Sequence, residues 1–467
     1  MAEPKQTDEA LASVLPRYGI SALKPEQRKI FDCLMRKDDC MAILPTGYGK
    51  SLPFQLFPAV ASFLPQTIGL RRHVVVCCPL RSLMEDQVEF LSKIPDITAG
   101  FKGSDDAMDQ LIKDGCIDII YASPESLLGD PEWRELMRKL KVAVIVVDEF
   151  HTISTWGEDS KGTEKCAFRK WFGHIGELRS MYPEASMLAL SATCTLKVRK
   201  RVMKILSLRP ETTVTITVSP NRPNIKLTAV KVSNILEMAM SWIVDGLSTL
   251  QETFPRTLIY CRSITDVSKL YAYISEELPE CVQHLEMFHS ETTDSSKEKV
   301  LDAVKNKESP IRLIIATSAL GMGIDFVDLH SVVLYGPPNT NLELIQEVGR
   351  AGRDGDPSVA LILSNSYHLH HVDSEVKAIF TTSECRRVAL MSSFLNPPDI
   401  NLLMKETGKH TCCDICYSLC KCKECEFLPL EQLFQAPSVD EESASEKDSD
   451  VTEDYNLSDY EDILWSP

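Results

Sequence analysis

The stretch that decides the fold is LPTGYGKS, residues 44–51. It follows the apolar segment CMAI, residues 40–43, and precedes an apolar stretch that can form a helix. Glycines at this spacing, followed by lysine and serine, are typical of a strand-to-helix loop whose backbone N–H groups surround a phosphate. We therefore expect Lys50 to contact the β and γ phosphates of a nucleotide and Ser51 to hold Mg²⁺.

This loop departs from the strict pattern in one place, because Leu44 stands where glycine is usual. A glycine turn with an incidental lysine is the alternative interpretation. On the nucleotide interpretation, the loop residues that line ATP are Thr46, Gly47, Tyr48, Gly49, Lys50 and Ser51.

A second motif, DEFH at residues 148–151, ends the most apolar segment of the chain, VAVIVV at 142–147. Ligands of parallel α/β proteins lie at the carboxyl ends of the strands, where these two carboxylates are expected. Asp148 would bind Mg²⁺, and Glu149 would orient and deprotonate the attacking water. An Asp-Glu pair at the end of a strand is often only a solvated helix cap. The catalytic interpretation of this pair therefore depends on its combination with Lys50. His151 completes the expected catalytic group in this part of the chain.

Short β-branched apolar segments alternate with longer amphipathic stretches along most of the chain, a pattern typical of parallel α/β folds. A break rich in proline and asparagine, SPNRPN at 219–224, separates two such series and indicates two lobes. The segments expected to be strands begin near residues 40, 73, 117, 142 and 187 in the first series, and near 257, 313 and 331 in the second.

Four parts are expected from these patterns. The first α/β lobe covers residues 1–218, the second covers 219–371, and a small helical, cysteine-rich unit covers 372–427. An acidic tail, 428–467, follows. Its last residues carry too little apolar surface to offset the entropy of ordering, so we expect the tail to be disordered.

The bulk composition excludes several classes of protein. With 467 residues, 44% of them hydrophobic and 25% charged, the chain resembles an ordinary globular protein rather than a fibrous or disordered one. No apolar run is long enough for a membrane span, and the start of the chain lacks a signal-peptide pattern. The net charge of −17 is only weak evidence against nucleic-acid binding, because many of the acidic residues lie after Val439. Without a signal peptide the protein is expected inside the cell, where its sixteen cysteines should stay reduced. Metal ligation is therefore favoured over disulfides.

Further motifs occur in the order found in superfamily 2 helicases. They are KPEQ (24–27), PLRSLMEDQ (79–87), SPE (123–125), SAT (191–193), YCR (260–262), ATSALGMGID (316–325) and QEVGRAGRDG (346–355). The residues of the last two motifs make the chain most similar to RecQ-type DNA helicases.

The resemblance implies two RecA-like lobes, with Gln27 as the residue that contacts adenine. It also implies a catalytic group in the second lobe, Gln346, Arg350 and Arg353. Arg353 would be the arginine finger and Arg350 its phosphate-contacting companion, because a planar and permanently charged guanidinium suits charge developing on the γ-phosphate.

The segment STWGED, 154–159, resembles the aromatic-rich loop that couples DNA binding to ATP hydrolysis in RecQ proteins. By this resemblance Trp156, Phe168 and Arg169 are expected to contact nucleic acid, Trp156 by stacking on a base. A core position for Trp156 is the alternative. The segment also departs from the family, since residues 160–167 intervene before Phe168 and Phe150 stands where alanine is usual.

The cysteine-rich unit resembles the zinc subdomain of RecQ proteins, whose ligands would be Cys385, Cys413, Cys416 and a fourth residue. His410 and Cys412 are the candidates for the fourth ligand. We expect His410, because Cys412 is too close to Cys413 for both to chelate comfortably. A rival set consists of Cys413, Cys416, Cys422 and Cys425. Both sets could also exist together, with a shared ion or with two ions, and a set of unliganded thiols is the remaining alternative.

The resulting hypothesis is a short RecQ-like enzyme without a winged-helix or C-terminal helical domain. It would use Mg²⁺ and ATP, carry Zn²⁺, and move 3′ to 5′ on single-stranded DNA while opening forked duplexes in the nucleus. A translocase that acts without unwinding, an RNA-acting motor, and a non-catalytic DNA scaffold are the alternatives. The acidic tail would bind a basic protein partner or only increase solubility.

Overall fold

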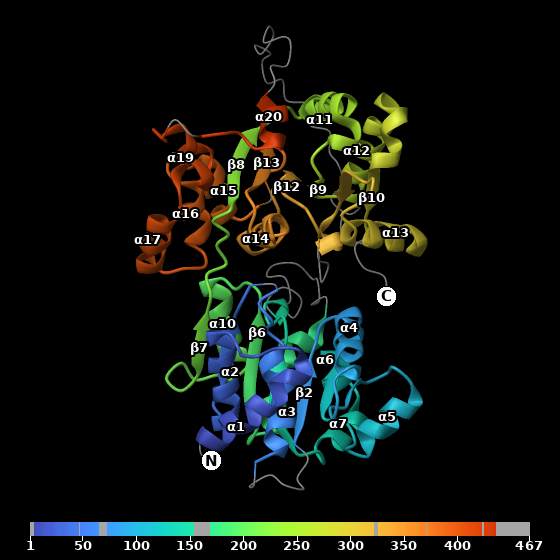
Figure 1. Ribbon diagram of the computed structural model, residues 1–467, viewed down its shortest axis with the longest axis vertical. Coiled ribbons are helices and arrows are strands. Elements are labelled where there is room, and N and C mark those ends of the chain that lie inside the picture. Colours follow the sequence, from blue (N-terminus) through green and yellow to red (C-terminus); the bar gives the residue numbers. More distant parts are fainter. Residues whose placement is uncertain are drawn as a thin grey trace. The chain divides into compact units, whose positions relative to one another are not determined.

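The computed structural model describes residues 4–45, 47–64, 72–153, 169–321, 326–370, 372–422 and 425–435 (Figure 1). The chain divides into two compact units, Met1–Pro220 and Asn221–Pro467. Each unit is built on one sheet of parallel strands, so the expected α/β class with two RecA-like lobes is confirmed. The boundaries expected at 218 and 371 stay predictions. No helix among the described residues is long and apolar enough to cross a bilayer.

The first unit contains a seven-stranded parallel sheet in the order β3-β4-β2-β5-β6-β1-β7. Both faces of its central strands are buried. Along β6, Leu188 and Leu190 pack into one apolar core while Met187 and Ala189 pack into another, because successive side chains of a strand point to opposite faces. The strands are β1 (Cys40–Ile43), β2 (His73–Cys77), β3 (Ala99–Phe101), β4 (Ile119–Ala122), β5 (Val142–Val147), β6 (Ser186–Ser191) and β7 (Val214–Thr217).

Helices cover the two faces of this sheet (Figure 1). They are α1 (Pro4–Val14), α2 (Pro25–Arg36), α3 (Leu52–Ser62), α4 (Arg81–Ser92), α5 (Asp106–Lys113), α6 (Pro124–Leu128), α7 (Pro131–Met137), α9 (Glu177–Met181) and α10 (Leu196–Ile205).

The second unit contains a six-stranded parallel sheet in the order β10-β11-β9-β12-β13-β8. Its strands are β8 (Ile225–Lys231), β9 (Thr257–Cys261), β10 (Leu285–Phe288), β11 (Leu313–Ala316), β12 (Ser331–Tyr335) and β13 (Ser358–Ser364). The helices of this lobe are α11 (Leu236–Leu250), α12 (Ile264–Glu277), α13 (Asp294–Lys305) and α14 (Asn341–Val348).

The cysteine-rich unit packs beside β8, the strand at one edge of this sheet (Figure 1). Leu227 of β8 forms a parallel bridge with Cys413, so the unit covers a strand edge that would otherwise be open. Leu390 and Ile400 of this unit belong to the same apolar core as Leu227. Its helices are α15 (Ser374–Thr381), α16 (Arg386–Met391), α17 (Pro397–Glu406), α18 (Lys409–Cys412) and α19 (Asp414–Ser418).

The start of the expected disordered tail needs correction. Residues Pro429–Gln435 form helix α20, with Leu430 fully buried. Leu430 and Leu433 pack into the same apolar core as α11, and this burial stabilises the short segment. The rest of the tail, from residue 436, lies outside the described residues.

A buried ion pair fastens α20 to the sheet. The Lys226 ammonium lies 2.8 Å from the Glu431 carboxylate, and each side chain is only 5% exposed. The Thr228 hydroxyl and the Leu428 backbone N–H also donate to this carboxylate. The rings of Tyr417 and Phe427 lie over the Lys226 ammonium, at 3.6 and 5.2 Å from their centroids. The desolvated charge is therefore compensated from several sides.

Replacement Glu431→Leu should leave the Lys226 charge buried without a partner. Removing one member of such a pair typically costs about 3 to 5 kcal/mol, so we expect urea unfolding of the second unit to shift by that amount. The double replacement Lys226→Met with Glu431→Leu should recover most of the loss. A loss below about 1 kcal/mol in the single variant would show that the pair is not needed there.

Candidate nucleotide and metal sites

Three neighbouring strands bring the motifs of the first unit to one edge of its sheet. Strand β6 lies between β1 and β5, and all three run parallel. The Leu44 N–H donates to the Ser191 carbonyl and the Phe150 N–H donates to the Leu190 carbonyl, each at 3.0 Å. The residues after β1, β5 and β6 are therefore held side by side at the carboxyl ends, where ligands bind in folds of this class.

The loop after β1 is shaped by two glycines in the left-handed region, Gly47 with φ 79° and Gly49 with φ 82°. Gln27 lies against this loop, and its side-chain amide donates to the carbonyls of Tyr48 and Gly49, both at 3.0 Å. A Cβ atom on Gly49 would lie 2.6 Å from the Gln27 nitrogen, so a side chain here would displace the Gln27 amide from the loop. The adenine contact implied for Gln27 stays a prediction, and Thr46 lies outside the described residues.

The carboxylate of Glu149 is the centre of a polar network at this edge. The Lys50 ammonium lies 3.2 Å from one oxygen, and the His151 imidazole lies 3.2 Å from the other. The Ser191 hydroxyl donates to that second oxygen at 3.4 Å and lies 2.9 Å from the His151 ring nitrogen. Glu149 has a backbone φ of 47°, unusual for a residue with a side chain, and its side chain remains 24% exposed. The carboxylate is thus oriented and still accessible.

The two adjacent carboxyls differ in their affinity for protons. Burial raises the pKa of Asp148 to about 6, and the neighbouring Glu149 charge adds to this effect. Burial also opposes ionisation of Glu149, but Lys50 and His151 outweigh it and hold the pKa of Glu149 well below its usual range. At neutral pH Glu149 is therefore a carboxylate that can accept a hydrogen bond from water. Asp148 is half-buried beside it, and a bound cation would favour its ionised form.

These residues fit Mg²⁺ and a nucleoside triphosphate. The N-terminus of α3 begins directly after Ser51, so the positive end of the helix dipole points toward the loop. Lys50 could contact phosphate oxygens, and Ser51 and Asp148 could hold Mg²⁺, which would supply charge to the phosphates. The roles of the individual residues stay predictions.

Arg169 connects two other motifs of the first unit. Its guanidinium pairs with Glu125, with one N–H donating at 2.8 Å, and another N–H donates to the Pro79 carbonyl at 2.6 Å. Pro79 follows β2, and Glu125 lies in α6, after β4. Arg169 was expected to contact nucleic acid, and that role stays a prediction beside the one seen here, which is to hold these segments together. Trp156 and Phe168 lie outside the described residues.

In the second unit the arginine motif follows α14, whose N-terminus is capped by Thr340 and Glu343. Gln346 lies on this helix, and the half-buried Arg350 and Arg353 follow it. Burial lowers the pKa of Arg350, and the nearby Tyr260 of the YCR motif opposes that shift. A guanidinium nevertheless stays charged at any physiological pH.

Two residues of the SPNRPN break hold the loop of this motif, a role that was not expected from the sequence. The Asn224 amide donates to the carbonyls of Gly352 and Asp356, both at 2.9 Å. The Arg222 guanidinium also donates to the Gly352 carbonyl. Gly352 has a φ of 56°, and a Cβ atom there would lie 2.5 Å from the Asn224 amide nitrogen. The break therefore supports the loop of the arginine motif and is not only a linker. The sequence feature that could have indicated this role is the polar NRPN segment beside the lobe boundary.

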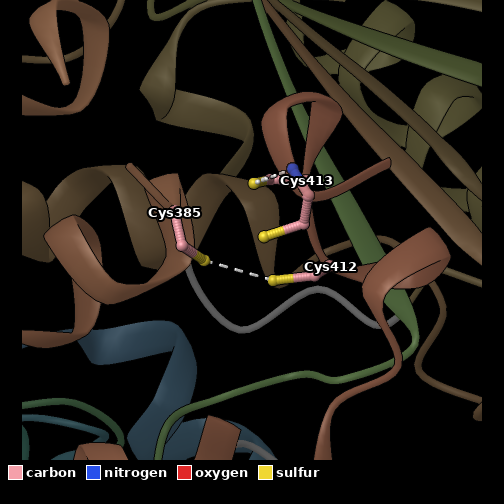
Figure 2. Close-up of side chains that lie close together, drawn as sticks. Cys385, Cys412 and Cys413 are labelled. Atoms are coloured by element: carbon pink, nitrogen blue, oxygen red, sulfur yellow. Dashed lines mark hydrogen bonds between the residues drawn. The ribbon is translucent and has the colours of Figure 1, made fainter. Parts of the chain in front are cut away.

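The cysteine-rich unit contains two groups of possible metal ligands. The first group consists of Cys385, Cys412, Cys413 and Cys416, whose sulfur atoms lie within 4.8 Å of one another. Figure 2 shows the sulfur of Cys385 directed at that of Cys412, 3.3 Å away, with Cys413 beside them. Four thiols that converge in this way fit a closed tetrahedral zinc site.

The fourth ligand of this group differs from the one expected. His410 lies outside the group and Cys412 takes its place, while Cys422 and Cys425 of the rival set also lie elsewhere. His410 and Cys412 are two residues apart on the short helix α18, which places their side chains about 200° apart around its axis. The backbone becomes extended at Cys413, with φ −157° and ψ 170°, so two successive cysteines can both reach the site.

Two arginines lie beside this group, the half-buried Arg386 and the buried Arg387. Arg386 pairs with both carboxylate oxygens of Asp414, at 2.7 and 2.9 Å. Arg387 donates to the Cys412 carbonyl at 2.9 Å, to the Arg222 carbonyl at 3.0 Å and to the Asn221 side chain at 2.6 Å. The cysteine group is therefore connected through Arg387 to the segment that holds the loop of the arginine motif.

Comparison with known proteins identifies the family. Residues 24–202 match the DEAD/DEAH box helicase family and residues 238–355 match the helicase conserved C-terminal domain. The chain is 30% identical to the ATP-dependent DNA helicase RecQ of Synechocystis sp. over 78% of its own length and 72% of that protein. The chain belongs to the RecQ family of helicases.

Other relatives differ in length from this RecQ-family chain. It is 31% identical to the mouse bifunctional 3′-5′ exonuclease/ATP-dependent helicase WRN over 85% of its own length, but this match spans only 28% of the mouse protein. Among solved structures, the DUF1998 helicase MrfA bound to DNA matches with a TM-score of 0.60 at 18% identity, over 78% of this chain and 52% of that one. This likeness concerns the fold.

Replacement Glu149→Gln should reduce ATP hydrolysis by about 100-fold or more, because the amide cannot take the proton of the attacking water. Binding of a fluorescent ATP analogue should remain, since Lys50 and the loop are unchanged. Steady-state hydrolysis and equilibrium binding measure the two effects, with the exposed Glu89→Gln on α4 as the control. Hydrolysis within about threefold of the wild type would contradict the role assigned to Glu149.

Replacement Asn224→Ala should loosen the loop that carries Arg353, because two backbone carbonyls lose a donor. We expect kcat for ATP to fall by about tenfold while nucleotide affinity in the first unit is unchanged. The control is Asn401→Ala, an exposed position on α17. An unchanged kcat together with a lowered unfolding midpoint would restrict Asn224 to a purely structural role.

Proposed function

We propose that this chain is a Mg²⁺-dependent ATPase that is stimulated by DNA, moves 3′ to 5′ on a single strand and separates forked duplexes. The observation that carries the proposal is the network of Lys50, Ser191 and His151 around the Glu149 carboxylate. This arrangement provides a fixed cation for phosphate and an accessible base for water. The names of the relatives supply the helicase activity and the DNA substrate, and the direction of movement follows from the family resemblance.

In this mechanism Glu149 holds the attacking water and accepts its proton, while Lys50 neutralises phosphate charge. Ser191, at the end of β6, bonds to the same carboxylate and therefore responds to any change in its position. By the family resemblance, Arg350 and Arg353 would stabilise the negative charge that develops on the γ-phosphate. Contacts to the DNA backbone should dominate, so little sequence preference is expected. A nuclear location, with DNA repair or recombination as the setting, belongs to this proposal.

The proposal is tested by steady-state ATPase rates without polymer, with single-stranded DNA and with single-stranded RNA. Fork unwinding is then measured on the same preparation, with either a 3′ or a 5′ single-stranded tail. We expect stimulation by DNA and unwinding only from the 3′ tail, both lost in Lys50→Ala, because the loop lysine is required for phosphate binding.

Each other outcome selects a different function. Stimulation without unwinding would indicate a translocase, and stronger stimulation by RNA would indicate an RNA-acting motor. DNA binding without any hydrolysis that depends on Lys50 would indicate a scaffold and overturn the proposal.

A further inference from the structure

A second group of metal-binding side chains lies in the cysteine-rich unit. It consists of His410, Cys420, Cys422 and Cys425, whose ligand atoms all lie within 4.8 Å of one another. The Cys422 sulfur is 3.3 Å from that of Cys420, 3.2 Å from that of Cys425 and 3.7 Å from Nδ1 of His410. The Cys420 sulfur is 3.9 Å from the same nitrogen. Three thiols and one imidazole thus converge on one point.

This group shares no residue with the group formed by Cys385, Cys412, Cys413 and Cys416. The opposite directions of His410 and Cys412 on α18 separate the two. The groups also differ in burial, because Cys412 and Cys413 are fully buried whereas His410 and Cys422 are exposed. A single ion therefore cannot serve both groups, and each has its own complete set of four ligands.

We propose that His410, Cys420, Cys422 and Cys425 form a second, structural zinc site. Thiolate and imidazole ligands favour Zn²⁺ over Mg²⁺ or Ca²⁺, which prefer oxygen. With Zn–S bonds of about 2.3 Å, tetrahedral ligands lie about 3.8 Å apart, close to the separations seen here. Four protein ligands fill the coordination shell, which is the arrangement of structural rather than catalytic zinc.

Contacts on both sides of the loop prepare it for the ion. The rings of Tyr417 and Phe427, which precede and follow the three cysteines, lie 5.0 Å apart. Both rings also lie over the Lys226 ammonium of β8. The Tyr417 hydroxyl is 3.5 Å from the Cys425 carbonyl. Because the ends of the loop are already held together, bringing Cys420, Cys422 and Cys425 into one site costs less entropy than in an open chain.

The position of the site indicates what it does. His410 belongs to α18, which packs against β8, and Cys425 lies just before α20, which Glu431 fastens to the same strand. An ion at this site would cross-link these two helical segments. It would thereby hold α20 and the aromatic rings in place over the buried Lys226. This role does not depend on ATP hydrolysis.

The test is the number of zinc ions per chain in full-length protein purified from zinc-supplemented cells under a thiol reductant without chelator. Elemental analysis and native mass spectrometry should find two ions in the wild type. The double replacement Cys422→Ser with Cys425→Ser should retain one. The control Cys116→Ser, a half-buried thiol outside both groups, should retain two.

A matched pair of variants at His410 distinguishes the loss of a zinc ligand from a folding defect. His410→Cys keeps a ligand and should retain two ions, whereas His410→Ala should lose the second ion in dilute chelator. Circular dichroism should show the same helix content in both.

Cobalt substitution of the wild type needs no mutation at all. The sulfur-to-metal absorption should correspond to seven cobalt–thiolate bonds, four from the first group and three from the second. A single zinc ion in the wild type, or cobalt absorption that corresponds to four thiolates only, would overturn the proposal. Two ions that both persist in the Cys422 and Cys425 double variant would overturn it as well.

Discussion

The constraint on which the rest of the structure depends is that every strand of each sheet runs in the same direction. Parallel strands bring all of their carboxyl ends to one edge, so short loops far apart in the sequence become neighbours there. This is how Lys50 after β1, Glu149 after β5 and Ser191 at the end of β6 meet. Without that common direction, the sequence motifs would be unrelated turns on different sides of a lobe.

Within the second unit, the buried Arg387 and the half-buried Arg222 connect parts that the sheet does not connect. Arg387 reaches from the cysteine-rich unit to the carbonyl of Arg222, and Arg222 reaches in turn to the carbonyl of Gly352, beside Arg353. Each donor is fixed by carbonyl acceptors, which leaves the arginine motif little freedom to drift. The cysteine-rich unit therefore helps to hold the arginine motif of the second unit in place.

The sequence was most informative where burial on both sheet faces produces continuous apolar segments. The central strands β1, β2, β5 and β9 could be predicted for this reason. The strands that were not expected include β3, β7, β8 and β10, all of which lie at sheet edges. An edge strand has one neighbour and a less continuous apolar pattern, as in β8, where the buried Lys226 interrupts the run. Strand β13 is apolar between its two terminal serines and buried throughout, and its pattern would have supported a prediction.

The site residues show the same division. Motif spacing is a local property, so the position of Lys50, Asp148 and Glu149 at the carboxyl ends of strands could be predicted from sequence, whereas their roles stay predictions. The choice between His410 and Cys412 depended on the direction of two side chains on a helix of four residues, followed by an extended residue. Likewise, α20 is ordered by Lys226, some two hundred positions earlier in the chain, and no local pattern reports a partner at that separation.

The order of the two ligand groups along the chain has a topological consequence. His410 precedes Cys412, Cys413 and Cys416, whereas the other members of its group, Cys420, Cys422 and Cys425, follow them. With ions in both places, the second cross-link would enclose the three inner thiols of the first within its own loop. The two cross-links would then overlap along the chain, because Cys385 of the first group lies outside the loop closed by the second. A chain that unfolds from its C-terminal side would have to open the exposed group before it reached the buried one.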